Sequence, residues 1–170
     1  ITFARGSSGT ALRRVGYGDE LVDNNDFATG DLTGWTTQSG SSVFTVSSGQ
    51  LTISRSASDP GYVYQIISTT AGSVYSFTYD IIDDGPLELR VGTSPAGLQI
   101  MAGGVKTSAG SYTHYFVATG ATTHVSFVNT SYSVDATIGN ISVREVIFDR
   151  ATDDLVLFNH PDDIPRIEYG

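Results

Sequence analysis

The chain has 170 residues, a formal net charge of −9 and an isoelectric point of about 4.5. This charge argues against binding to nucleic acid or to anionic membrane surfaces, because both require basic residues that neutralise phosphates. The sequence has no apolar run long enough to cross a membrane. Because it has no cysteine, no disulfide can stabilise it, and we expect a buried core or association with other chains to do so.

The first 36 residues contain two different segments. Residues 1–19 are strand-like at both ends, with a Ser/Gly turn between them. In the segment 21–36, Phe27 and Trp35 bracket a Gly-rich loop whose Asp and Thr side chains can hydrogen-bond to their own backbone. Trp35 is the only tryptophan, and we expect it to anchor this loop to the core.

The middle of the chain alternates apolar and polar residues as β-strands do. The segment 73–82 is the clearest case, with Tyr75, Phe77 and Tyr79 on the face expected in the core. The segments expected to form strands are 43–47, 51–53, 61–67, 73–82, 87–91, 112–118, 124–129 and 138–146. No window has a convincing helical period, so the pattern predicts an all-β fold, an antiparallel two-sheet β-sandwich.

The sequence lacks the motifs of common catalytic sites. It has no Gly-x-Ser-x-Gly elbow, no His-Glu-x-x-His and no phosphate-binding Gly-rich loop before a helix. Its three histidines, His114, His124 and His160, are too widely spaced for a short metal motif. We therefore expect no enzyme activity. Sequence alone does not exclude a pair of carboxylates from distant strands, which is the arrangement that glycoside hydrolysis uses.

The order of several short motifs resembles the carbohydrate-binding-module jelly rolls. Those modules open with an Asn-Gly-Asp-Phe-like turn, a Gly and a Gly-Trp, which read here as residues 24–27, Gly30 and Gly34-Trp35. The later segments that resemble these modules are GQLTIS at 49–54, YQIISTTAGSVYSFTYD at 64–80, LRVG at 89–92, YFVATGATTHVSFVN at 115–129 and IGNISVREV at 138–146. The resemblance covers about residues 20–147 and implies a jelly roll that binds sugars.

Sugar binding combines flat aromatic faces with planar polar groups. On the solvent face of one sheet we expect Tyr62, Tyr64 or Gln65, Asp80, Glu88, Arg90, Tyr115 and His124. Asp80, Glu88 and Arg90 lie on strands joined by one turn, so the sequence predicts that they form a charged trio. The alternative is a cross-strand ion pair that only keeps the sheet soluble.

In the resembled modules a structural calcium often joins the two ends of the jelly roll. Its usual acidic positions correspond here to Ala28 and Gly139, so the expected carboxylates are missing. Calcium prefers several oxygen ligands, some of them charged. We therefore predict no metal or other cofactor, with a rearranged site on Asp23, Asp26, Asp31 and Asp135 as the alternative.

The flanks 1–19 and 148–170 resemble a segment of bacteriophage tail and tail-fibre proteins. The shared pattern is Phe3, Arg5 and Ser7, followed by the closing residues 165–169. This resemblance implies that the jelly roll at 20–147 is inserted into a larger virion protein, located extracellularly on the tail or fibre. The implied partners are bacterial surface glycan and neighbouring tail subunits, and the implied assembly is a trimer. The alternatives are a purely structural or oligomerisation domain of the virion and a carbohydrate-binding module of a secreted glycoside hydrolase.

Overall fold

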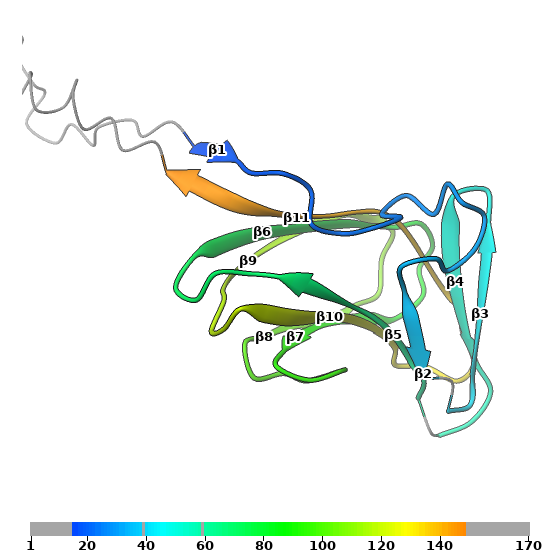
Figure 1. Ribbon diagram of the computed structural model, residues 1–170. Helices are drawn as coiled ribbons and strands as arrows, with labels where there is room; N and C mark the ends of the chain where they lie inside the picture. Colours follow the sequence, from blue (N-terminus) through cyan, green and yellow to red (C-terminus); the bar gives the residue numbers. More distant parts are fainter. Residues whose placement is uncertain (1–14, 39, 59, 149–170) are drawn as a thin grey trace, which may run out of the picture. The chain divides into compact units, whose positions relative to one another are not determined.

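The computed structural model describes residues 15–38, 40–58 and 60–148. These residues form two antiparallel β-sheets packed face to face, as Figure 1 shows. They contain no helix, and hence no helix that could cross a membrane. The predicted all-β jelly-roll sandwich is confirmed.

The first sheet has the strand order β3-β4-β11-β6-β9, with β1 paired to β11. Its strands are β1 (Val15–Tyr17), β3 (Ser42–Ser47), β4 (Gln50–Arg55), β6 (Val74–Ile81), β9 (Gly110–Val117) and β11 (Ala136–Phe148). The second sheet has the order β2-β5-β10-β7-β8. Its strands are β2 (Thr36–Gln38), β5 (Tyr62–Ser68), β7 (Leu87–Gly92), β8 (Met101–Lys106) and β10 (Thr122–Asn129).

Local sequence explains how the strands begin and end. Strands β3 and β4 form a hairpin through Ser48 and Gly49, both with positive φ (55° and 74°), as two-residue hairpin turns require. The turn between β6 and β7 depends on Gly85, where a Cβ atom would lie 1.9 Å from the carbonyl oxygen of Asp135. This turn carries the chain from the first sheet to the second.

The core between the sheets is rich in aromatic rings. Phe127 is fully buried, and its ring centroid lies 5.8 Å from that of Phe77, 5.2 Å from that of Tyr79 and 6.3 Å from that of Trp35. Trp35 in turn packs on Phe27 at 5.8 Å. The prediction that Trp35, Tyr75, Phe77 and Tyr79 belong to the core is confirmed.

The chain divides into two compact units, one of which comprises Tyr17–Val146. The other comprises Ile1–Gly16 and Ile147–Gly170. Of the small β element expected from the two chain ends, the structure describes only the pairing of β1 with β11. The rest of that prediction, including the Phe3 and 165–169 motifs, lies outside the described residues.

Candidate functional site

The outer face of the second sheet carries most of the predicted ligand-binding residues. On this face, which we call the β5–β10–β7 face, side chains align in three rows across the strands: Tyr62, Val128 and Glu88, then Tyr64, Ser126 and Arg90, then Ile66, His124 and Gly92. Ser126 and Val128 in the middle strand are almost fully buried. The hydroxyl of Ser126 accepts a hydrogen bond from the amide of Ala96 at 3.0 Å, so the segment between β7 and β8 helps to cover the middle strand.

Three rings form a continuous aromatic row on this face. The ring centroids of Tyr62 and Tyr64 lie 6.0 Å apart, and those of Tyr64 and His124 lie 5.9 Å apart. Burial lowers the pKa of His124, so its imidazole is neutral at pH 7. Its Nδ1 atom is buried and has no hydrogen-bond partner among the described residues. The row thus offers apolar ring faces, whereas Nδ1 of His124 is buried beneath the surface.

A planar charged pair lies across the middle strand from the rings. Nε and Nη2 of Arg90 both donate to Oε2 of Glu88, at 2.9 and 2.7 Å. The two side chains retain 27% and 15% of their exposure, so the pair lies at the surface without extending into solvent. Because β5 and β7 flank β10, the pair lies about 10 Å from the tyrosine strand, two strand spacings away.

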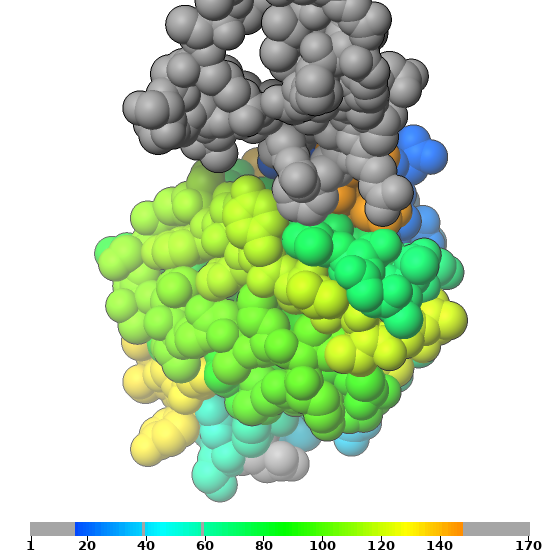
Figure 2. Space-filling view, turned by 90° about the vertical axis from the view of Figure 1, so that its left-hand side faces the viewer, coloured from blue at the N-terminus to red at the C-terminus, as the bar shows by residue number. Residues whose placement is uncertain are grey.

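The segment 93–100, between β7 and β8, folds over part of the middle strand of this face. The amide of Ala96 donates to Oγ of Ser126 at 3.0 Å, and the amide of Ile100 donates to the carbonyl oxygen of Val91 at 3.1 Å. A Cβ atom on Gly92 would lie 2.7 Å from the backbone carbonyl carbon of Gly97, so the close approach of this segment requires glycine there. In Figure 2 this segment belongs to the green atoms in the middle of the view, together with the neighbouring strands β7 and β8. The segment therefore contacts the β5–β10–β7 face in its middle row, at Ser126, between the strands that carry Tyr64 and Arg90.

Two predicted site residues lie on the opposite sheet, and the predicted charged trio is wrong. Asp80 is on β6 and Tyr115 is on β9, both in the first sheet, whereas Glu88 and Arg90 are in the second. The turn between β6 and β7 crosses from one sheet to the other instead of forming a hairpin. Asp80 instead accepts hydrogen bonds from the side chains of Ser111 and Asn140.

Gln65 points inward, so its placement on the solvent face is also wrong. Its Oε1 accepts from the amide of Asp23 at 2.8 Å, and its Nε2 donates to the carbonyl oxygens of Asp23 and Gly34 at 3.1 and 3.0 Å. Between the alternatives Tyr64 and Gln65, the outward residue is Tyr64. The function of Gln65 is to hold the opening loop against β5.

The opening loop is ordered by hydrogen bonds within the protein. Oδ1 of Asp26 accepts from the amide of Ala28 at 3.1 Å, and the carbonyl oxygen of Asn25 accepts from the amide of Ile141 on β11 at 2.9 Å. Across residues 15–38, 40–58 and 60–148, no three His, Asp or Glu side chains gather as a metal site would require. Positions 28 and 139 contribute no oxygen from a side chain.

The sequence analysis missed Glu20, which joins the opening segment to β11. Its carboxylate accepts hydrogen bonds from the amides of Leu21, Val22 and Val143 at 3.1, 3.1 and 2.8 Å, from the hydroxyl of Ser142 at 2.5 Å and from Nε of Arg144 at 3.2 Å. The resemblance to modules whose two ends are joined by calcium could have indicated this role, because it implies that some group must link the two ends of the jelly roll. Here a carboxylate and protein donors join them.

The chemistry available on the β5–β10–β7 face is stacking and hydrogen bonding. The rings offer apolar faces for C–H groups, and the Glu88–Arg90 pair offers planar donors and acceptors. The carboxylate of Glu88 is already engaged by Arg90, so nothing on this face prepares a proton transfer. Such an arrangement can recognise a polyhydroxylated ligand.

Comparison with known structures gives the same fold. A family 4 carbohydrate-binding module (CBM4) has a TM-score of 0.56 at 12% identity, covering 73% of this chain and 99% of that one. The xylan-binding domain CBM22-1 of Paenibacillus barcinonensis has a TM-score of 0.56 at 13% identity, covering 76% and 96%. The enzymatically active domain of tailspike protein 4 of bacteriophage CBA120 has a TM-score of 0.60 at 12% identity, covering 75% of this chain but only 21% of that one.

Comparison at the level of sequence identifies a family. A search of the curated proteins finds no match. The family DUF642, whose description is "protein of unknown function", matches residues 28–144, which comprise most of the jelly roll, including β5, β7 and β10. The chain therefore belongs to the DUF642 family.

Proposed function

We propose that this chain is a non-catalytic glycan-binding module and that the β5–β10–β7 face is its binding surface. The observation that carries the proposal is the row of Tyr62, Tyr64 and His124 rings facing the Glu88–Arg90 pair across one strand. The similarity in fold to several carbohydrate-binding modules supports the same function.

The proposed ligand is a neutral glycan. The chain has a net charge of −9, which repels polyanionic chains at low salt. The β5–β10–β7 face itself adds no net charge, because Glu88 and Arg90 neutralise each other. Stacking on tyrosine and hydrogen bonding to planar groups need no charge on the sugar.

The biological setting that we propose is a bacteriophage tail or fibre that displays the module toward bacterial surface polysaccharide. It rests on the resemblance of residues 1–19 and 148–170 to tail proteins, and the fold shared with part of a phage tailspike is compatible with it. Trimeric assembly would repeat weak sites and raise their combined affinity. The second candidate, a module of a secreted glycoside hydrolase, is favoured by the fold that the chain shares with 27% of an α-L-arabinofuranosidase.

A glycan array tests the proposed function. The purified chain is applied to neutral plant oligosaccharides, including cellohexaose and xylohexaose, and to bacterial envelope polysaccharides, with and without calcium. We expect saturable binding that does not need calcium, weakened at least about tenfold by Arg90→Ala. The matched control is Tyr132→Ala, which removes an exposed aromatic residue outside the face. A folded chain that binds no glycan on the array would overturn the proposal and favour a structural role.

A further inference from the structure

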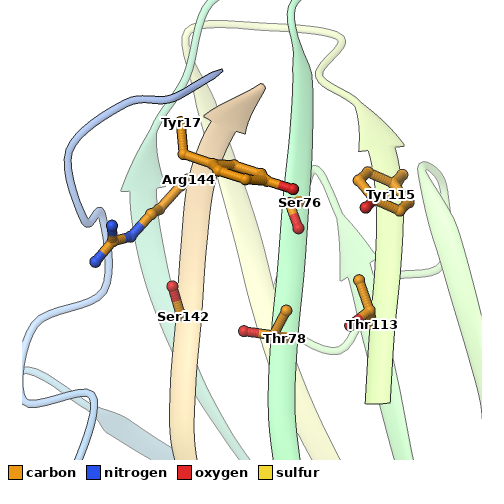
Figure 3. A pocket seen from close by; sticks show the side chains of 7 residues that line it. All are labelled: Tyr17, Ser76, Thr78, Thr113, Tyr115, Ser142 and Arg144. Atoms are coloured by element: carbon orange, nitrogen blue, oxygen red, sulfur yellow. The ribbon is translucent and has the colours of Figure 1, made fainter. Parts of the chain in front are cut away.

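The outer face of the first sheet carries a separate pocket of about 320 Å³. This volume lies at the lower end of the range for pockets that hold small molecules, about 300–1,000 Å³. The lining residues, shown in Figure 3, are Tyr17, Ser76, Thr78, Thr113, Tyr115, Ser142 and Arg144. We call it the β11–β6–β9 pocket. Because the lining strands belong to the sheet opposite the tyrosine row, the pocket is distinct from the β5–β10–β7 face.

The floor of this pocket carries several hydroxyl groups; that of Ser76 belongs to a residue that is only 6% exposed. Two rows cross the strands, one with Ser142, Thr78 and Thr113 and the other with Arg144, Ser76 and Tyr115. Within the described part of the chain, no side-chain hydrogen bond engages the hydroxyls of Ser76, Thr78 or Thr113. Each hydroxyl can donate one hydrogen bond and accept others. Three such groups on one concave surface match a ligand that itself carries several hydroxyls.

Two tyrosine rings flank this floor. The side chains of Tyr17 and Tyr115 are 51% and 57% exposed, whereas Tyr75 and Tyr79, which point inward on β6, are almost fully buried. Figure 3 shows the Tyr17 ring reaching from β1 toward Ser76 and Tyr115. The phenol groups interact, and a hydrogen bond with Tyr115 raises the pKa of Tyr17. Exposed ring faces beside free hydroxyls combine the two kinds of contact that sugars make with proteins.

The charged groups near the pocket are turned away or already paired. The guanidinium of Arg144 points away from Tyr115 in Figure 3, and its Nε donates to Glu20 at 3.2 Å. Asp80, beyond Thr78 on β6, is engaged by Ser111 and Asn140. Arg144 is the one charged residue among those that line the pocket, and its Nε is engaged by Glu20; the other lining residues are neutral.

From these observations we infer a second carbohydrate-binding site in the β11–β6–β9 pocket, for a single neutral sugar unit or the end of a neutral chain. Tyr17 and Tyr115 contact the ring faces, and Ser76, Thr78 and Thr113 bind the sugar hydroxyls. The inference does not depend on the β5–β10–β7 face. If both surfaces bind, one module holds two glycan segments on opposite sheets, which raises its avidity for a dense polysaccharide layer.

The test is an NMR titration of the full ¹⁵N-labelled chain with methyl glycosides of glucose, galactose and mannose, and with cellohexaose and xylohexaose. We expect saturable shifts of the Ser76, Thr78 and Thr113 amides. Tyr115→Ala should weaken this binding at least about tenfold. Thr78→Val should also weaken it while leaving the unfolding midpoint unchanged, because the hydroxyl has no partner among residues 15–38, 40–58 and 60–148. The matched control is Val117→Ala, another exposed residue on β9 outside the pocket.

The outcomes separate this site from the one proposed above. Shifts in the pocket that persist in Tyr64→Ala but disappear in Tyr115→Ala support two independent sites. Shifts confined to β5, β10 and β7 would overturn the second site and leave the first intact. Pocket shifts that survive Tyr115→Ala and Thr78→Val unchanged, or a folded chain whose pocket amides do not move with any of these probes, would also overturn it.

Discussion

The Glu20 carboxylate allows a sharp prediction about stability. Replacing Glu20 with Gln keeps the shape of the side chain but removes its charge and replaces one acceptor oxygen with an NH₂ group. Five donors then face a group with one acceptor. A hydrogen bond to a charged group contributes about 1.5–3 kcal/mol, against about 1 kcal/mol for a neutral one. The side chain is 22% exposed and its pair with Arg144 is solvated, so we expect a loss of about 2 kcal/mol at pH 7.

The same prediction has a definite pH dependence. Burial raises the pKa of Glu20, but the hydrogen bonds donated by Ser142 and by the amides of Val143 and Val22 outweigh it, so the pKa lies below its ordinary value of 4.5. A lowered pKa in the folded state means that the stabilisation is complete above pH 4.5. It is lost as the pH falls through the folded-state pKa. The difference between wild type and Glu20→Gln should therefore shrink in acid.

Urea unfolding at pH 7 and at several values below pH 4.5 measures this difference. With a slope of about 2 kcal/mol per M, the midpoint of Glu20→Gln at pH 7 should lie about 1 M below that of wild type. Asp19→Asn, one residue earlier and exposed, is the matched control and should change little. Equal midpoints at pH 7, or a difference that does not diminish in acid, would refute the assignment of Glu20 as the group that joins the opening segment to β11.

Three further predictions concern the fold. Gln65→Ala removes the clamp on Asp23 and Gly34 and should cost about 2–3 kcal/mol in urea unfolding; an unchanged midpoint would mean that the clamp is dispensable. Phe127→Ala empties the centre of the aromatic core and should cost about 3–5 kcal/mol; a cost below about 1 kcal/mol would contradict its central packing. Gly85→Ala drives a Cβ atom into the backbone at Asp135 and should lower the melting temperature by several degrees; calorimetry that shows no change would contradict the close approach.

The positions of most strands, and which of their side chains face the core, could be predicted from the sequence. Alternation in β6 predicted the buried Tyr75, Phe77 and Tyr79, because a strand turns successive side chains to opposite faces. Alternation does not say which strands pair. The turn at Gly85 looked like a hairpin, yet β6 pairs with β9 and β11 while β7 pairs with β8 and β10. Strand β8 was missed because it contains Gly103 and Gly104, and a pair of glycines weakens any strand signal.

The candidate site was predictable only where it follows from alternation. Tyr62, Tyr64, Glu88, Arg90 and His124 do share one outer face, because they occupy outward positions on neighbouring strands of one sheet. Other features depend on contacts distant in sequence. The clamp formed by Gln65 joins residues 42 positions apart, and Glu20 binds residues more than 120 positions away. No local pattern reveals such contacts.

The measurement that tests the central claim most directly is calorimetric titration of the full chain with the glycan that binds best on the array. Wild type, Tyr64→Ala and Tyr132→Ala are compared after circular dichroism has shown that all three are folded. The account predicts that Tyr64→Ala weakens binding at the β5–β10–β7 face at least about tenfold, while Tyr132→Ala leaves it unchanged. Equal affinity of wild type and Tyr64→Ala would contradict the assignment of this face as the glycan-binding surface.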